Sequence, residues 1–229
     1  MYKLIVPRVP GDDVLFDSIV YANVKNISTQ TEIINITDDY PNETIHSKYF
    51  KALINLKEND LKDDDVLIFC HNDCGIIDPL FKEKVDRFFE TTDVALLGFV
   101  GSSKMKEDLC WWNSEPQYLR GHLMQGNKDD NNATHLIKGA IGFYNDLIMI
   151  DGFCFVTLGK YFKNFPINFD NSYKGNHFYD MDLCRQFMFQ DLKIGVADIL
   201  MYHKSPGSSP SDENWKSDRA NFLLKADYI

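Results

Sequence analysis

Short apolar runs alternate with amphipathic stretches through the first hundred residues, and this alternation limits the chain to a small set of folds. Apolar runs predict buried strands at residues 2–7, 31–37, 66–70 and 94–100. Helices are predicted at 14–23 and 43–58, and a third begins at Pro79, because proline fits the first turn of a helix. Strands that alternate with helices imply crossover connections. We therefore expect an α/β fold with a mostly parallel central sheet, flanked by helices on both faces.

The pattern changes after Gly101. Residues 102–132 are polar, irregular and rich in aromatic side chains, which predicts long loops over a ligand site rather than core. Further strands are expected at 147–150, 153–157 and 194–202, a helix at 179–190, a loop at 205–214 and a short terminal helix. The sequence has no internal repeat, heptad pattern or low-complexity linker, which favours a single domain.

Composition excludes several classes of protein. A chain of 229 residues with 44% hydrophobic side chains can bury a core without disulfides or a structural metal. Its net charge of -10 argues against nucleic-acid binding, although a divalent cation could still bring in a small phosphorylated ligand. No membrane-length apolar stretch and no signal peptide are present, so we expect a cytoplasmic protein. Five scattered cysteines are typical of buried thiols in a reducing compartment.

Polar side chains directly follow one of the predicted strands. The apolar run 66–70 ends in His71, Asn72 and Asp73. Open α/β sheets bind ligands at the carboxyl ends of their strands, so a carboxylate and an imidazole here could hold a divalent metal against phosphate oxygens. The alternative is a polar turn in which Asp73 caps the following segment. A zinc pair formed by Cys70 and Cys74 is disfavoured, because no second Cys/His pair lies at finger spacing.

A second group of polar residues lies late in the chain. Asp180 and Asp182 fall in the first turn of the helix predicted at 179–190, where the helix dipole stabilises carboxylates. They could also be ordinary helix-start acids, with Asp182 paired to Arg185. His203 follows the strand predicted at 194–202. Taken alone, such a residue is more often a structural histidine than a ligand.

Taken together and in this order, these segments resemble glycosyltransferases of the GT-A fold. The stretch YDMDLCRQ, followed after a short gap by KIGVADILMYHKS, is similar to the second half of family-2 enzymes, where an acidic pair begins a helix and a later strand ends in a histidine. The strand end VLIFCHND and the segment IDGFCFVT at 150–157 are most similar to the StrF-related glycosyltransferase-like group. The resemblance covers about residues 60–208, and the N-terminal part agrees in pattern only.

The resemblance implies roles for individual residues. Asp73 lies where these enzymes keep the metal-binding acid of their DxD motif. His71 stands in place of the first acid, and is implied as a further ligand or as a residue that orients Asp73. His203 matches the late histidine that often completes metal coordination. Asp180 falls where inverting family-2 enzymes place the catalytic base, although Tyr179 replaces the acid that usually precedes it.

The resemblance also implies that Gly152 matches a small residue whose backbone lets the acceptor approach. Further candidate contacts of the donor nucleotide come from their positions at or just after predicted strands, where they could equally be ordinary turn or loop residues. They are Pro7, Arg8, Val9, Asp38, Asn72 and Ser102. A group of large side chains could form an acceptor platform, since aromatic faces stack on sugars, or could simply pack a long loop. Its members are Trp111, Trp112, Tyr118, Arg120 and His122.

The implied activity is that of a metal-dependent glycosyltransferase of the hexosyltransferase type. It would move a sugar from a nucleoside-diphosphate donor, a UDP-sugar, to a glycan or other hydroxyl acceptor, with Mn²⁺ or Mg²⁺ as cofactor. A single domain, 1–229, would comprise a nucleotide-binding half (1–101), an acceptor and catalytic half (102–208) and a C-terminal tail (209–229). Two alternatives stay open: a metal-dependent phosphohydrolase, and a non-catalytic domain that binds nucleotide sugar or glycan.

Overall fold

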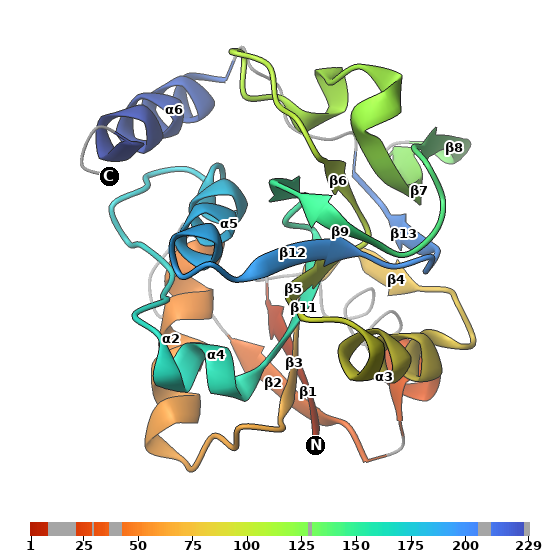
Figure 1. The fold of residues 1–229 in the computed structure, drawn as a ribbon, viewed down its shortest axis with the longest axis vertical. Coiled ribbons are helices and arrows are strands. Elements are labelled where there is room, and N and C mark those ends of the chain that lie inside the picture. Colours follow the sequence, from red (N-terminus) through yellow and green to blue (C-terminus); the bar gives the residue numbers. More distant parts are fainter. Residues whose placement is uncertain (9–21, 29, 37–42, 128–129, 206–211, 227–229) are drawn as a thin grey trace.

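The structure is a computed structural model, and it describes residues 1–8, 22–28, 30–36, 43–127, 130–205 and 212–226. Within this part of the chain, a seven-stranded sheet has the order β2-β1-β3-β11-β5-β12-β9 (Figure 1). Its strands are β1 (Tyr2–Pro7), β2 (Glu32–Ile36), β3 (Val66–Cys70), β5 (Val94–Gly98), β9 (Tyr144–Leu147), β11 (Cys154–Leu158) and β12 (Lys193–Val196).

A second sheet has the order β10-β6-β7-β13-β4, with β8 paired to β7. Its strands are β4 (Cys74–Ile76), β6 (Val100–Ser102), β7 (Leu119–Asn127), β8 (Asp130–Lys138), β10 (Met149–Ile150) and β13 (Met201–His203). Four of these strands adjoin strands of the first sheet along the chain: β4 follows β3, β6 follows β5, β10 precedes β11 and β13 follows β12. The two sheets therefore meet where β3 and β5 end.

Helices cover both faces of the first sheet. The described residues contain a short helix at 22–27, α2 (Ile45–Glu58), α3 (Phe81–Thr91), α4 (Gly159–Asn164), α5 (Tyr179–Phe189) and α6 (Glu213–Ala226), with 3₁₀ turns η1 (Trp111–Asn113) and η2 (Pro116–Tyr118). Figure 1 shows α2, α4 and α5 on one side and α3 on the other. Strands β1, β3 and β5 are buried along their whole length, which explains their continuous apolar runs. Among the described helices, none has both the length and the apolar character needed to cross a membrane.

The predicted α/β class with a helix-flanked central sheet is confirmed, but the sheet is mixed rather than mostly parallel. Strand β1 is parallel to β2 and β3, and β12 is parallel to β5. By contrast, β11 runs antiparallel to β3 and β5, and β9 antiparallel to β12. Residues 151–153 alone join β10 to β11, so the chain enters the first sheet from the edge where β3 ends. An apolar run predicts a buried strand, but it carries no information on the direction of that strand.

Three local expectations differ from the structure or lie outside it. The irregular loops expected at 102–132 contain β7 and the start of β8, whose polar residues hid the strand pattern. The strand expected at 194–202 divides into β12 and β13, which pair in different sheets. The helix predicted at 14–23 falls almost wholly outside the described residues, although 22–27 are helical.

The core beside β3 is aromatic and holds the end of that strand in place. The rings of Phe69 and Phe155 stack with their centroids 5.0 Å apart, and Tyr49 from α2 meets Phe69 edge-on at 5.1 Å. Such pairs are stabilising beyond the area that they bury, by about 0.5–1.5 kcal/mol each. All five cysteines are buried and free, as the sequence predicts. The residues after β3 therefore begin at a rigidly packed strand end.

Candidate active site

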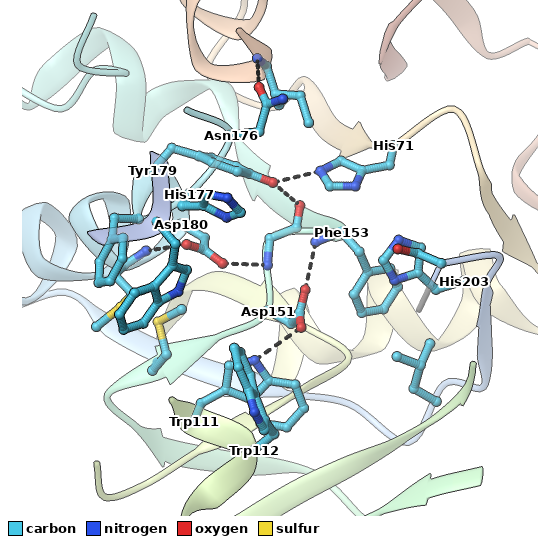
Figure 2. Close-up of a pocket in the computed structure, with 18 of the residues that line it drawn as sticks. His71, Trp111, Trp112, Asp151, Phe153, Asn176, His177, Tyr179, Asp180 and His203 are labelled. Carbon is cyan, nitrogen blue, oxygen red and sulfur yellow. Dashed lines mark hydrogen bonds between the residues drawn. The ribbon is translucent and has the colours of Figure 1, made fainter. Parts of the chain in front are cut away.

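A cavity of about 350 Å³ lies beyond the carboxyl end of β3 (Figure 2). Its lining includes His71 and Asp73 after β3, Gly152 between β10 and β11, Asp180 at the start of α5, and His203 at the end of β13. Open α/β sheets bind ligands at this edge, where polar side chains can converge without disturbing the core. The structure thus brings together four of the site residues predicted from the sequence: His71, Asp73, Asp180 and His203.

Four side chains form a cluster that could hold a metal ion. The donor atoms of His71, Asp73, Cys74 and His203 all lie within 4.8 Å of one another. His203 Nε2 is 3.5 Å from Asp73 Oδ1. Strand β13 runs antiparallel to β4 and places His203 opposite Cys74. The backbone pairing of two short strands therefore brings His203 to residues that are far away in the sequence.

The chemistry of this donor set fits a divalent ion. Imidazole nitrogens suit transition metals, whereas Mg²⁺ prefers oxygen ligands alone. With bonds of 2.0–2.3 Å, adjacent ligand atoms lie about 2.8–3.3 Å apart around an octahedral ion and about 3.3–3.8 Å apart around a tetrahedral one. The Asp73 and His203 donor atoms, 3.5 Å apart, lie close to these ranges. The residues present therefore fit a divalent cation, and Mn²⁺ better than Mg²⁺.

The phenol of Tyr179 connects this cluster to the turn between β10 and β11. Its Oη lies 2.7 Å from His71 Nε2 and 2.8 Å from the carbonyl oxygen of Gly152 (Figure 2). Burial is the main reason that the pKa of Tyr179 lies well above its ordinary value. The hydroxyl group therefore keeps its proton at neutral pH.

Asp180 is the carboxyl group at the start of α5. Its Oδ2 accepts a hydrogen bond from the Gly152 N–H at 2.9 Å, and its Oδ1 accepts one from the Met181 N–H at 2.9 Å. Burial, and then the negative charge of Asp151, raise the pKa of Asp180 to about 7, although the two N–H donors act in the opposite direction. A carboxyl group that titrates near neutral pH and lines a cavity is suited to accept a proton.

The chain enters α5 through a strained residue. Phe178 has a φ of 62°, in the left-handed region that bulky residues rarely adopt. Such a conformation costs about 1–3 kcal/mol and persists only where the surroundings impose it. The Phe178 ring packs on Trp215 and Phe222 of α6, with centroids 5.1 and 5.6 Å away. Helix α6 therefore helps to fix the start of α5, where Asp180 lies.

Gly152 lies so close to α5 that no side chain fits there. A Cβ atom on Gly152 would be 2.5 Å from Tyr179 Oη and 2.8 Å from Asp180 Cβ. The sequence resemblance implied a small residue here so that an acceptor could approach. The structure gives a second reason, because the absence of a side chain lets the turn bind both Tyr179 and Asp180.

Gly152→Ala is therefore expected to destabilise the fold and to displace the start of α5. Overpacking a rigid site costs about 1–3 kcal/mol, and the displacement would lower activity as well. Gly75→Ala is the matched control, because a Cβ on this glycine of β4 would make only ordinary contacts, the nearest at 3.6 Å. Chemical denaturation of both variants measures the difference. Equal stabilities would contradict the close approach at Gly152.

Comparison with known proteins identifies the family. The model of the glycosyltransferase-like family matches residues 23–224. The chain belongs to this family. No curated protein matches it by sequence. Among solved structures, it is similar to GalNAc-T7 in complex with UDP, GalNAc and Mn²⁺, with a TM-score of 0.53, 9% identity, and coverage of 94% of this chain and 47% of the other.

A second structural match is a glycosyltransferase involved in the glycosylation of the major capsid of PBCV-1, with a TM-score of 0.48, 9% identity, and coverage of 96% of this chain and 98% of the other. The chain spans about half the length of the GalNAc-T7 chain that it matches. The predicted GT-A fold and the membership of a glycosyltransferase-like family are confirmed. The assignment to the StrF-related group stays a prediction.

The second acid at the start of α5 makes structural contacts. Asp182 is buried and its Oδ1 accepts a hydrogen bond from Arg185, the partner expected from the sequence. Its Oδ2 accepts another from Gln186 at 2.8 Å. Asp182 does not line the cavity, so Asp180 is the acid of this pair that can meet a substrate.

All three tryptophans of the chain line the cavity. Trp111 is buried, and its Nε1–H donates to Asp151 Oδ2 at 3.0 Å. Trp112 is 37% exposed and lies at 88° to Trp111, so part of its surface is accessible. Trp215 reaches the cavity from α6. Trp111 and Trp112 therefore line the cavity, Trp111 also packs locally, and their role as an acceptor platform stays a prediction.

The other members of the expected platform lie elsewhere among the described residues. Arg120 pairs with Asp146 at 2.8 Å, and His122 Nδ1 lies 3.8 Å from Asp198 Oδ1. Tyr118 is half-buried outside the cavity. Strand β7 carries Arg120 and His122 in the second sheet. They are therefore part of the sheet rather than of the loop predicted from the sequence.

Only some of the candidate nucleotide contacts lie near the cavity. Pro7 and Arg8 lie at the end of β1, which is parallel to β3, so they share a sheet edge with His71 without lining the cavity. Asn72 lies between two lining residues. Ser102 is fully buried, its Oγ donates to the Lys104 carbonyl oxygen at 2.6 Å, and it does not line the cavity. Val9 and Asp38 lie outside the described residues.

Sequence reasoning missed three features of the site. Asp151 anchors Trp111 and raises the pKa of Asp180, but the sequence indicates no role for it beyond its place in the segment 150–157. Tyr179 departs from the acidic pair of the resembling family, and the sequence does not reveal its contact with His71. Trp215 falls in the stretch expected to be a tail. The Asp-Gly pair before an apolar run was the one local signal available for the turn at 151–152.

Proposed function

We propose that this glycosyltransferase moves a hexosyl group from a UDP-sugar to a hydroxyl group of a glycan or small molecule, with Mn²⁺ or Mg²⁺ as cofactor. One observation carries the proposal: the donor atoms of His71, Asp73 and His203 lie within 4.8 Å of one another, in the same cavity as Asp180. A cation site and a carboxyl group that titrates near neutral pH are the groups that such a transfer needs. The fold shared with a structure solved with UDP and Mn²⁺ supports this assignment.

The charge of the cavity supports a requirement for a cation. Among the described lining residues there is no Lys or Arg, whereas Asp73, Asp151 and Asp180 are all present. A nucleoside diphosphate would therefore meet a negative surface. A divalent ion held by His71, Asp73 and His203 would neutralise the leaving diphosphate. Without that ion, the acidic cavity would repel the donor.

On the acceptor side, Asp180 is the proposed general base. Its carboxylate would take the proton of the acceptor hydroxyl, while the N–H groups of Gly152 and Met181 hold it in position. Direct displacement by that hydroxyl inverts the anomeric centre. The exposed part of Trp112 offers an apolar face on which the acceptor sugar can stack.

The pH dependence of turnover follows from the raised pKa of Asp180. A base must be deprotonated, so the rate should fall as the pH drops through a midpoint at or below about 7, since a bound cation lowers the pKa further. Asp151→Asn removes a negative charge that raises this pKa, and should move the midpoint to lower pH. Rate profiles of both proteins at saturating donor measure the shift. A midpoint that stays in place would contradict the coupling of these two acids.

A panel of nucleotide sugars tests the proposed activity. The protein is incubated with Mn²⁺ and each donor, and release of free sugar and nucleoside diphosphate is followed. We expect slow hydrolysis only of the sugars that are linked to UDP. Turnover of these donors should become faster once an acceptor is present. Release of inorganic phosphate from simple phosphate esters would instead indicate a phosphohydrolase. Binding without any turnover would indicate a non-catalytic nucleotide-sugar or glycan domain.

A further inference from the structure

At two positions this chain has a different residue where the GT-A enzymes that it resembles have an acid, and these two residues contact each other. His71 stands in place of the first acid of the metal motif, and Tyr179 in place of the acid before the base. The Tyr179 Oη lies 2.7 Å from His71 Nε2 and 2.8 Å from the Gly152 carbonyl oxygen. Figure 2 shows the end of the phenol ring facing the imidazole of His71. The two differences thus form one hydrogen-bonded unit.

Only one arrangement of protons makes both of these contacts hydrogen bonds. A phenol has a single proton, and a carbonyl oxygen can only accept. If Tyr179 donated to His71, two oxygen atoms with no proton between them would face each other at 2.8 Å. Tyr179 must therefore donate to Gly152 and accept from the Nε2–H of His71.

This arrangement decides which nitrogen of His71 can bind a metal. When a neutral imidazole carries its proton on Nε2, the lone pair is on Nδ1. The hydrogen bond of one ring nitrogen sets which nitrogen binds the metal, and outer partners of this kind also fix the orientation of the ring. We propose that Tyr179 is a positioning residue that holds His71 in the tautomer whose Nδ1 binds the divalent cation. This inference rests on the cation site of the proposed function.

In this arrangement the backbone of Gly152 has two partners, Tyr179 and Asp180. Its carbonyl oxygen accepts from Tyr179, and its N–H donates to Asp180. One peptide turn thus orients a metal ligand through Tyr179 and the proposed base directly. Tyr179 and His71, which each stand in place of an acid, would then act together in the proposed metal site.

The first test needs no metal. Nitrogen-15 NMR of the histidine side chains in the metal-free protein, with His71 assigned by its loss in His71→Ala, reports which ring nitrogen carries the proton. We expect the proton on Nε2 in the wild type. A proton on Nδ1 would overturn the inference. Because this measurement uses the wild-type protein, it stands even if a variant folds poorly.

The second test measures the affinity for Mn²⁺ alone, by electron paramagnetic resonance of the free ion. Tyr179→Phe should lower the affinity by about 10- to 100-fold, the usual loss for an outer-shell partner of a metal-bound histidine. Tyr49→Phe is the matched control. Tyr49 is fully buried, its ring centroid is 6.1 Å from that of Tyr179, and its hydroxyl has no hydrogen-bond partner in the part of the chain that the structure describes. We expect Tyr49→Phe to bind Mn²⁺ like the wild type.

A double-mutant cycle separates positioning from a general structural effect. If Tyr179 acts through His71, Tyr179→Phe should cause no further loss of Mn²⁺ affinity in a His71→Ala protein. Additive losses, or equal affinities of the wild type and Tyr179→Phe, would overturn this inference alone. A wild-type protein with no affinity for Mn²⁺ would instead overturn the cation site on which the proposed function depends.

Discussion

Asp73→Ala is expected to abolish cation-assisted nucleotide binding and to leave the fold intact. Asp73 supplies the only carboxylate of the described metal cluster, and although it is buried, it lines the cavity rather than the apolar core. Its removal therefore deletes a proposed direct ligand and enlarges the cavity without opening a hole in the apolar core. The loss of Mn²⁺-assisted UDP affinity, measured by calorimetry, should exceed the roughly 10- to 100-fold effect of an outer-shell change.

Two further variants serve as comparisons for Asp73→Ala. Asp78→Asn is a matched control, because Asp78 is a buried acid just beyond β4 that pairs with Lys84 at 2.7 Å and does not line the cavity. It should lose stability and keep nucleotide affinity. His203→Ala should weaken binding less than Asp73→Ala, since carboxylate and diphosphate oxygens would still hold the ion. Unchanged Mn²⁺-assisted affinity in a folded Asp73→Ala protein would contradict the metal assignment.

Asp180→Asn should separate chemistry from binding. The amide keeps the shape of the side chain but cannot take the acceptor proton, so turnover should fall by about 10²- to 10⁴-fold. Affinities for donor and cation should persist, because Asp180 is outside the metal cluster. The amide has one acceptor oxygen for the two N–H groups of Gly152 and Met181, so a small loss of stability is also expected. Rates are therefore compared per folded molecule.

Asp182→Asn is the control for this prediction, since it makes the same change two residues away. Asp182 is held by Arg185 and Gln186 outside the cavity, so its substitution should lower stability but affect turnover less. The reverse ranking of the two variants, or an Asp180→Asn protein with the wild-type rate, would contradict the assignment of the base. A product that retains the anomeric configuration would also count against it.

The sequence predicts elements of this fold where local burial dominates. The strand expected at 66–70 coincides with β3, because a strand covered on both faces has a continuous apolar run. The helix expected at 179–190 matches α5 to one residue, since its acids mark the start of the helix. His71, Asp73 and Asp180 could be found because they directly follow or begin such elements.

Features that depend on pairing between distant segments could not be predicted in this way. The meeting of His203 with Cys74 requires that β13 leaves the first sheet and pairs with β4. The role of Asp151 depends on Trp111, which lies 40 residues away, and that of Tyr179 on His71, 108 residues away. Ser102 was expected to contact the donor because it follows a strand, but it belongs to β6 and is buried. Local patterns carry none of this information.

The most direct test of the proposed function is the thermal stability of the wild-type protein with UDP, in Mn²⁺ and in a metal chelator. The acidic cavity, with its cluster of His71, Asp73 and His203, predicts that UDP raises the melting temperature when Mn²⁺ is present and has little effect without it. Simple phosphate esters should stabilise the protein much less than UDP in Mn²⁺. Equal stabilisation by UDP with and without the ion, or by UDP and phosphate esters alike, would contradict a metal-dependent nucleotide-sugar site.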